Sequence, residues 1–399
     1  MYGFKAERKY EGINNRVVTD KVKWGMWVIM AMVIGIAMLI ASYFFTDMPL
    51  VLMIEQSKPG IEFLNKIIEY GGMHRQMLAF AWGGIVLFLL GMQIYLVTRK
   101  SNKTRGLRMA GLILAVLAAA SYPFLSKDIY TYIFSAKMVV DYGVNPYLVP
   151  PNTFLGKDLW LDLMGSVERP YFYGPVYLGL SIVPLLILGT NRVITVLASF
   201  KIINLVFFII GGWAVEKLVK DKNRAMAMWW FSPLLLIELL VNGHNDLVMI
   251  TLFLLGMVWL EKRKIFGWVV FLMSMLSKWI SAGLLPIVVA GKYRNQVAGF
   301  MAIGMFYFLM IRGGQAWYWT WMFMLLPLIE IKDKKSWVAI FIFQVVLMFG
   351  YISFVVTKKW GEGWEVLYWV WKFGYLLPVV VWWWERSHIP AKIKTREIS

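Results

Sequence analysis

The sequence predicts an all-α polytopic membrane protein: a bundle of about 12–14 transmembrane helices with a long external loop. The chain has 399 residues, of which 60% are hydrophobic, whereas an average soluble domain has about 45–50%. Its mean hydropathy is +0.63. The apolar residues lie in long runs, and a membrane span needs about 20 such residues. Lys and Arg cluster between the runs, as expected for cytoplasmic loops.

The overall composition also excludes several kinds of site. The net charge is +18, but the positions of the basic clusters are explained by membrane topology, so we expect no nucleic-acid partner. The chain has no cysteine, which excludes disulfides, thiolate chemistry and cysteine metal sites. The first apolar run, near 22–45, is too long for a cleavable signal and predicts a first helix.

The apolar runs predict the order of the elements. A basic N-terminal segment precedes spans near 22–45 and 76–98, with a mixed-charge external loop between them. A third helix near 107–124 leads outward to a long polar segment, Ser126 to Tyr173, which is rich in Pro, Asn, Asp and Tyr. Long ordered loops are usually functional. Further spans are predicted near 174–189, 225–241, 246–260, 295–311, 315–330, 336–356 and 363–384.

We divide the chain into an N-terminal part (1–104), a catalytic membrane module (105–330) and a C-terminal part with a basic tail (331–399).

Two apolar runs, near 192–218 and 265–290, each carry one lysine close to the middle, Lys201 and Lys278. A lysine at the centre of a bilayer costs about 3 kcal/mol on insertion scales. If each run is a hairpin of two short halves, the lysine lies at the external apex and the basic clusters return to the cytoplasm. The alternative is two long tilted helices with snorkelling lysines.

Asp128 is the candidate acid–base residue. It directly follows the third predicted helix, so we expect it at the external membrane surface, where a carboxylate can accept a proton from a sugar hydroxyl. Burial there would raise its basicity. The alternative is an ordinary helix-capping aspartate. Lys201 and Lys278 are candidates to bind a donor phosphate, since a lysine offers such a group a point charge.

A second polar group, Asn242 to Asp246, lies between two apolar runs, one helical turn after Glu238. His244 and Asp246 could act together as a catalytic base or as metal ligands. They lack a matched third ligand, so we favour substrate positioning by hydrogen bonds. A plain polar turn is the alternative. The aromatic run Gln315 to Trp321 could line the same cavity, although an interfacial aromatic belt is the simpler interpretation.

The sequence contains no Walker loop, no Rossmann glycine fingerprint and no HExxH. A soluble nucleotide site and a zincin site are therefore not expected.

Several short motifs occur in a characteristic order. Asp128 with Tyr130 and Tyr132, then Asn145-Pro146-Tyr147, Tyr173-Gly174-Pro175 and His244-Asn245-Asp246, resemble the polyprenol-phosphate-mannose-dependent mannosyltransferases of the GT-C class. The resemblance extends over residues 105–330, and Lys278 followed by Pro286 is similar to the short-helix hairpin of relatives.

The resemblance implies that Asp128 is the general base and that an acceptor hydroxyl attacks the donor's anomeric carbon while polyprenyl phosphate leaves. Direct displacement inverts the anomeric configuration, although Asp141 or Asp246 could serve as a second carboxylate in double displacement. No metal or other cofactor is required. The expected substrate-binding residues are Tyr130, Tyr132, Asn145, Tyr147, Tyr173, His244, Asn245 and Asp246.

The resulting hypothesis is a multi-pass glycosyltransferase of the bacterial plasma membrane, active at its external face in building the cell envelope. Its expected partners are the lipid bilayer, a polyprenyl-phosphate sugar, with mannose implied by the resemblance, and a glycan or glycolipid acceptor. The rivals are a transporter or flippase, which would also have broken helices and buried charges, and a polymerase or ligase of lipid-linked glycans.

Overall fold

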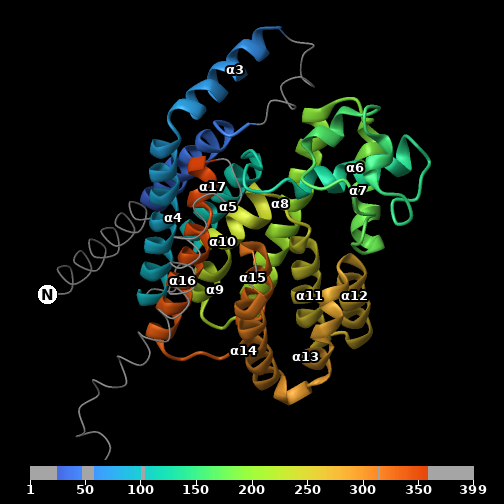
Figure 1. The fold of residues 1–399 in the computed structure, drawn as a ribbon. Helices are drawn as coiled ribbons and strands as arrows, with labels where there is room; N and C mark the ends of the chain where they lie inside the picture. Colours follow the sequence, from blue (N-terminus) through green and yellow to red (C-terminus); the bar gives the residue numbers. More distant parts are fainter. Residues whose placement is uncertain (1–24, 47–57, 100–103, 313–314, 358–399) are drawn as a thin grey trace, which may run out of the picture.

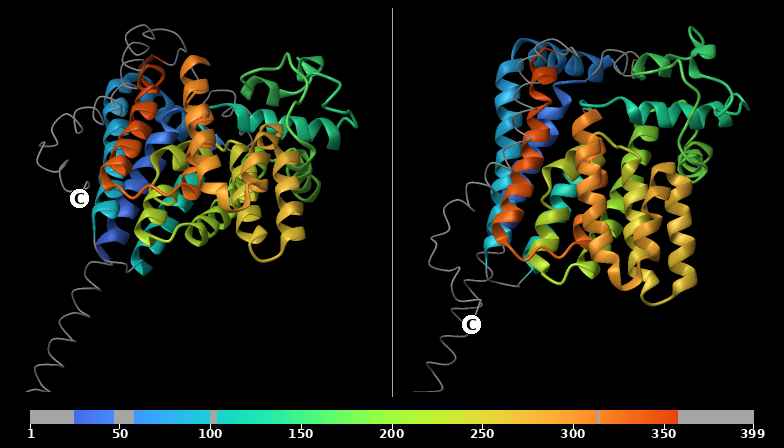
Figure 2. Two further views of the ribbon diagram at one scale, coloured as in Figure 1. Left: turned by 90° about the horizontal axis from the view of Figure 1, so that it is seen from below. Right: turned by 60° about the horizontal axis from the view of Figure 1, so that its bottom comes forward.

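The fold is a helical bundle with one helix lying across its end (Figures 1 and 2). The computed structural model describes residues 25–46, 58–99, 104–312 and 315–357. Within these ranges every regular element is helical and no strand occurs, which confirms the all-α class.

The helices of the first half are Gly25–Tyr43, α3 (Lys58–Met73), α4 (Arg75–Thr98), α5 (Arg105–Ala120), α6 (Asp128–Val140), α7 (Pro175–Leu188) and α8 (Val193–Leu218). Those of the second half are α9 (Lys222–Trp229), α10 (Pro233–Leu235), α11 (Asp246–Leu260), α12 (Lys264–Ser277), α13 (Leu285–Val289), α14 (Arg294–Arg312), α15 (Ala316–Phe323), α16 (Lys334–Phe349) and α17 (Ile352–Thr357). A π-helical turn, η3 (Leu236–Val241), continues α10, and short 3₁₀ turns are η1 (Pro151–Phe154), η2 (Leu159–Leu163), η4 (Trp279–Leu284), η5 (Gly291–Tyr293) and η6 (Leu326–Leu328).

The chain is a multi-pass membrane protein, although its described part holds fewer long spans than the 12–14 expected. Four helices are long and apolar enough to cross a membrane, or up to five if the bent pair of α9 with α10 and η3 counts as one. Predicted spans near 174–189 and 246–260 form helices of 14 and 15 residues, short of the about 20 needed to cross unaided. The predicted span at 363–384 lies outside the described residues.

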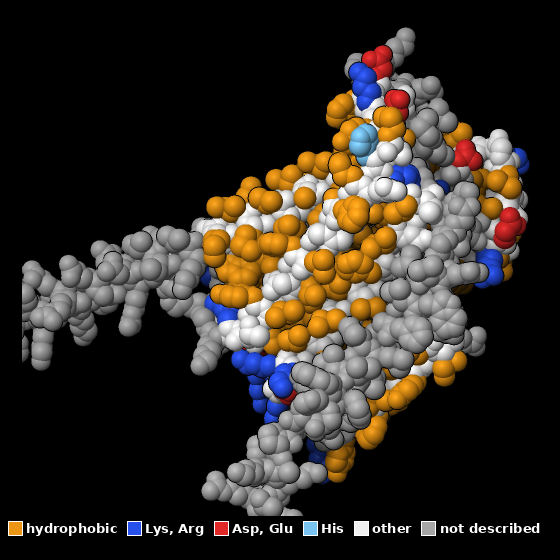
Figure 3. Space-filling view, turned by 60° about the vertical axis from the view of Figure 1, so that its left-hand side comes forward, with side chains coloured by type: hydrophobic (Ala, Val, Ile, Leu, Met, Phe, Trp, Pro, Cys, Tyr) orange, Lys and Arg blue, Asp and Glu red, His pale blue; other side chains and the backbone are white. Residues whose placement is uncertain are grey.

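One face of the molecule shows the apolar surface that a bilayer would cover. Hydrophobic side chains dominate this face, and Lys and Arg side chains gather at its lower edge (Figure 3). Exposed large apolar residues on α4 include Phe80, which is 82% exposed. In water such exposure would be costly, at about 25 cal/mol per Å² of apolar surface, so lipid contact is the consistent explanation.

The α6 helix lies across the tops of the upright helices (Figure 2), and α7 packs beside it. The Tyr177 ring in the first turn of α7 contacts Tyr132 on α6, with ring centres 5.1 Å apart. Beyond the other end of α7, the Thr190 hydroxyl donates to Asp141 at 2.7 Å. Thus α7 begins and ends beside α6, which gives the chain one fewer crossing than we counted from the sequence.

The predicted hairpin at 192–218 is therefore wrong. These residues form one continuous helix, α8, of 26 residues. We predicted a break in this run because every basic cluster had to lie on the cytoplasmic side. Since α7 adds no crossing, one continuous α8 already returns the chain to that side. Likewise, the predicted mixed-charge loop between the first two spans contains a helix, α3.

The second predicted hairpin is confirmed. The α12 helix ends at Ser277, Lys278 has extended backbone with φ −152° and ψ 119°, and η4 and α13 continue beyond it. The Gly174 N–H, just before α7, donates to the Ser277 carbonyl at 3.0 Å. This bond ties α7 to the turn that carries Lys278.

The α11 helix packs against both α8 and α12, and nearly all of its side chains are buried. It follows directly from the broken span of α9, α10 and η3, so the polar turn that joins them lies inside the protein. Asn242, His244, Asn245 and Asp246 in this turn are at most 1% exposed.

Candidate active site

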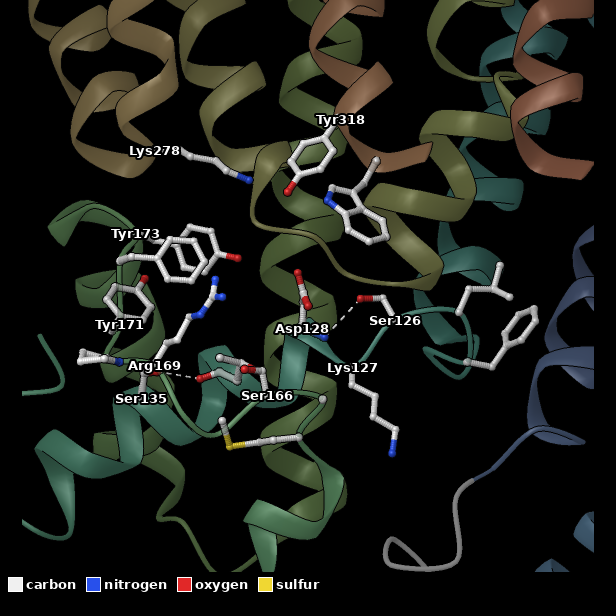
Figure 4. A pocket seen from close by; sticks show the side chains of 18 of the residues that line it. Ser126, Lys127, Asp128, Ser135, Ser166, Arg169, Tyr171, Tyr173, Lys278 and Tyr318 are labelled. Atoms are coloured by element: carbon white, nitrogen blue, oxygen red, sulfur yellow. Dashed lines mark hydrogen bonds between the residues drawn. The ribbon is translucent and has the colours of Figure 1, made fainter. Parts of the chain in front are cut away.

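A cavity of about 860 Å³ lies between α6 with the long polar loop on one side and the helices of the bundle on the other (Figure 4). Its polar wall comes from the start of α6 and from the loop at 164–173, and its opposite wall comes from the Lys278 turn and α15. At one end the cavity is apolar, where Phe45, Phe124 and Phe354 line it. Helices near the two ends of the chain therefore contribute to the same cavity as the central module.

Asp128 is the first residue of α6 and lines this cavity. Its side chain is 39% exposed, and it points into the space that faces Lys278 and Tyr318 (Figure 4). Burial raises the pKa of the Asp128 carboxyl, but hydrogen bonding to His244, the charges of His244 and Lys278, and a hydrogen bond from Tyr132 together hold that pKa below its ordinary value. Burial thus acts in the direction that we expected, but the favourable contacts outweigh it, so the carboxyl is less basic than expected.

Lys278 enters the cavity from the opposite wall. Its ammonium donates to Asp246 at 2.8 Å and to the Asn245 side-chain oxygen at 3.3 Å. The ammonium also lies over the rings of Tyr173 and Trp321, 5.2 Å from each centre. The Trp321 indole N–H donates to the same Asp246 oxygen. Lys278 is thus fixed in direction by a buried carboxylate and framed by two aromatic faces.

His244 lies behind Asp128, away from the cavity lining. Its Nδ1 is 3.4 Å from Asp128 Oδ2, and its Nε2 is 3.3 Å from Glu238 Oε2. The imidazole stacks on Trp317, with ring centres 5.1 Å apart. Burial lowers the pKa of His244, but hydrogen bonds and charge from Asp128 and Glu238 raise it to about 9. The two carboxylates therefore favour the charged form of the imidazole.

Among the predicted substrate-binding residues, Tyr173 lines the cavity and the rest do not. The rest fall into two groups. The Tyr132 hydroxyl lies 3.2 Å from the Asn245 side-chain oxygen and 3.4 Å from Asp128 Oδ2, and it can donate to either. Tyr132 is 1% exposed. Asn245 and Asp246 likewise lie behind the wall, where they hold Tyr132 and Lys278. Asn245 and Asp246 therefore hold the side chains of the cavity wall in place but do not themselves line the cavity.

Tyr130, Asn145 and Tyr147 also lie outside the cavity lining. Tyr130 is fully buried, and the Asn145 side chain accepts from the Tyr147 N–H at 3.0 Å, closing a local turn. The Tyr147 ring packs on Tyr171, with centres 5.3 Å apart. Asn145 and Tyr147 therefore shape the loop, since an asparagine side chain that bonds the backbone two residues on stabilises a turn.

Lys201 does not line the cavity. It lies within continuous α8, is 6% exposed, and its ammonium donates to the carbonyls of Leu240, at 2.7 Å, and Val241. The π-helical turn leaves these carbonyls at its end without the usual intrahelical donors. The lysine supplies that missing donor, so the structure corrects its predicted place at an external apex.

Sequence reasoning missed two cations that line the cavity. Arg169 and Lys127 line the cavity, and the Arg169 guanidinium points toward the space near Tyr173, whereas Lys127 points away (Figure 4). Within the described residues, Asp128 is the only carboxylate among the lining side chains. The run at 315–321 does line the cavity through Trp317, Tyr318 and Trp321.

No group of three or more His, Asp or Glu side chains in the described ranges is arranged to hold a metal ion.

Comparison with known proteins adds the family. Residues 28–294 match the family model described as alpha-(1->6)-mannopyranosyltransferase, N-terminal domain. Alpha-(1->6)-mannopyranosyltransferase A of Corynebacterium glutamicum is 27% identical over 190 residues, covering 45% of this chain and 37% of that protein. A probable alpha-(1->6)-mannopyranosyltransferase of Mycolicibacterium smegmatis is 32% identical over 143 residues, covering 34% and 25%. The alpha-(1->6)-mannopyranosyltransferase of Mycobacterium tuberculosis is 30% identical over 147 residues, covering 34% and 24%.

The matched stretches span well under half the length of these relatives, and no solved structure matches the chain. The resemblance to mannosyltransferases that the motifs indicated is confirmed. Because the family model covers more than half of the chain, the protein belongs to the alpha-(1->6)-mannopyranosyltransferase N-terminal-domain family.

Proposed function

We propose that this protein transfers a mannosyl residue from a polyprenyl-phosphate donor to an acceptor hydroxyl at the external face of a bacterial plasma membrane. The observation that carries this proposal is the opposition of one ionised carboxylate, Asp128, and one fixed ammonium, Lys278, across a single cavity. The names of the similar proteins support mannose and an α-1,6 linkage. Such a step needs a base for the acceptor proton and a cation for the leaving phosphate, and the two groups can supply these roles.

The proposed reaction is a direct displacement. The acceptor oxygen attacks the anomeric carbon and forms the new C–O bond, while its proton moves to Asp128. The bond between the anomeric carbon and the phosphate oxygen breaks, and its electron pair leaves with the phosphate. Inversion follows, and it is supported by the absence of a second carboxylate among the described lining residues. Asp246 is engaged by Lys278 and Trp321, and Asp141 lies at the far end of α6.

The cavity suits an anionic, amphipathic donor. Lys278 and Arg169 would neutralise the phosphate from two sides, and removal of charge from the leaving group lowers the barrier. The aromatic faces of Tyr173, Tyr318 and Trp321 offer stacking surfaces for sugar rings. The apolar end at Phe45 and Phe354 would receive the beginning of the hydrocarbon chain. A metal is not required in this scheme.

The test is transfer by purified protein in lipid nanodiscs. The protein is incubated with a panel of polyprenyl-phosphate sugars and a synthetic mannoside acceptor, and both polyprenyl phosphate release and the linkage of the product are measured. We expect mannose to be transferred with inversion. Asp128→Asn should lower kcat by about 10²- to 10⁴-fold, the contribution of a general base, with donor binding retained.

The matched control is Asp141→Asn at the other end of α6, which should retain most of the rate. Equal rates for Asp128→Asn and the wild type would overturn the assignment of the base. Donor movement across the bilayer that survives Asp128→Asn, without any transfer, would favour the transporter alternative.

Sidedness has its own test. Because the chain has no cysteine, Ser126→Cys introduces a unique thiol at the cavity edge. A membrane-impermeant maleimide should label it on intact cells. Labelling only after lysis would place the cavity on the cytoplasmic side.

A further inference from the structure

A buried imidazole lies between two carboxylates directly behind Asp128. His244 and Glu238 are both completely buried, and the contacts run from Asp128 Oδ2 to His244 Nδ1 and from His244 Nε2 to Glu238 Oε2, at 3.4 and 3.3 Å. Glu238 and His244 do not line the cavity, so neither can touch a substrate there. A buried carboxylate is costly unless it is paired, and His244 is the cation that Glu238 faces.

The local fold brings this pair together by an unusual turn. Glu238 belongs to the π-helical turn η3, and the His244 N–H donates to the Glu238 carbonyl at 3.2 Å. Asn242 joins the two segments, since its side-chain N–H donates to Glu238 Oε2 at 3.0 Å and its oxygen accepts from the Leu125 N–H at 3.3 Å. Single π-helical turns are rare and occur frequently at functional sites.

The contacts on Asp128 are one-sided. Both His244, at 3.4 Å, and the Tyr132 hydroxyl, at 3.4 Å, approach Oδ2. Among the described residues no hydrogen-bond partner approaches Oδ1 from a side chain. The carboxylate is thus held by Oδ2, and the side chain as a whole points into the cavity (Figure 4).

We propose that Glu238 and His244 form a positioning pair that keeps an imidazolium against Asp128 Oδ2 and so presents Oδ1 to the acceptor hydroxyl. This inference rests on the proposed transfer reaction. In the resting site two carboxylates flank one imidazolium, and uptake of the acceptor's proton by Asp128 leaves His244 paired with Glu238. The buried pair therefore keeps its charge balance during the step, and His244 need not reorganise.

Other groups also face this trio and are part of its electrostatics. They come from α6, η3, the turn after α12, α15 and the segment after α16, and they are Tyr132, Asn242, Lys278, Trp317 and Tyr351. Of these, Lys278 is the only cation, and it is already paired with Asp246.

The pair predicts a specific pH dependence. Transfer should need an ionised Asp128 and a charged His244, so the rate should fall on the alkaline side when His244 loses its proton. Glu238→Gln removes one of the two carboxylates that favour the charged imidazole. We expect the alkaline limb of kcat/KM to move down by at least about one pH unit, and kcat to fall about tenfold to a hundredfold because the imidazolium loses the charge that holds it. The donor KM should change little, because Glu238 does not reach the cavity.

Two further variants separate positioning from folding. Glu238→Asp keeps the carboxylate and should leave the alkaline limb near its wild-type position. Ser232→Ala removes a buried hydrogen bond to Gln344, of 2.7 Å, from the same broken span, and should lower the melting temperature without moving either limb. If Glu238→Gln behaves like Ser232→Ala, the pair is merely structural and the inference is overturned.

A readout independent of transfer is the titration of His244 by NMR in the full-length protein. The chain has 3 histidines, so the His244 ring signal can be assigned with His244→Gln. We expect its pKa well above the ordinary value in the wild type and lower in Glu238→Gln. An ordinary pKa in the wild type would overturn the inference even if mannose were transferred. A raised pKa of His244 in a protein that transfers no sugar would support the charged pair and would contradict the proposed function.

Discussion

Replacement of Gly174 by alanine tests how the two cavity walls are joined. The Gly174 N–H donates to the Ser277 carbonyl at 3.0 Å, beside Lys278. A Cβ built at this glycine would lie 1.9 Å from the Leu276 carbonyl oxygen and 2.4 Å from its carbonyl carbon. Carbon–oxygen contacts are normally at least about 3.3 Å, so the start of α7 and the Lys278 turn must separate by more than about 1 Å. Because the obstacle is backbone, no side-chain rotation relieves it.

The expected loss follows from that displacement. Overpacking costs about 1–3 kcal/mol of stability, and a misplacement of about 1 Å in a reacting geometry can lower the rate about 10²-fold. Thermal unfolding and mannose transfer by the Gly174→Ala protein should both show the loss.

Gly179→Ala on the same helix is the matched control, since nothing lies within 4 Å of its built Cβ. It should stabilise the protein by up to about 1 kcal/mol through helix propensity. The reasoning fails if Gly174→Ala has the melting temperature and rate of Gly179→Ala.

Further predictions separate the roles of the charged groups. Lys278→Gln should raise the donor KM at least about tenfold, by loss of a charged phosphate contact, and an unchanged KM would remove Lys278 from the phosphate site. Lys201→Met should instead leave the donor KM unchanged and lower stability by about 1–3 kcal/mol, as buried carbonyls lose their donor; a raised KM with normal melting would contradict this. Arg169→Gln, on an exposed loop side chain, should raise the donor KM without a change in melting temperature, and a lower melting temperature would indicate a structural role. The pKa of His244 is raised from 6.5 to about 9 in the folded protein, so its stabilising contribution is fully present below pH 6.5 and is lost as pH rises through about 9. The melting temperature of the wild type should therefore fall more steeply over that interval than that of His244→Gln, and parallel curves would refute the assignment.

The sequence predicted those parts of the fold that depend on local pattern. The run at 246–260 became a helix with the same bounds, and the lysine in the run at 265–290 correctly marked a chain reversal. The same argument failed at Lys201, because a mid-helix lysine can be satisfied by carbonyls of another segment. A hydropathy pattern carries no information about such a tertiary contact.

The candidate site was predicted unevenly for a similar reason. Asp128, Lys278 and Tyr173 line one cavity, as the motifs indicated. Whether His244 would face a substrate or lie behind Asp128 depends on the π-helical turn, and the sequence around Glu238 gives no periodic signal for that turn. Arg169 was missed because it lies in a loop without a motif, although the polar loop itself was singled out.

The phenylalanines at the apolar end of the cavity bring together distant parts of the chain. Phe45 and Phe124 stack with ring centres 4.7 Å apart, and Phe354 comes from α17, beyond the stretch that the family model matches. For the proposed polyprenyl-phosphate donor, the fit of the hydrocarbon chain would then be set by side chains that take no part in bond making. Changes at these phenylalanines should alter which lipid carrier is accepted and leave Asp128 and Lys278 in place.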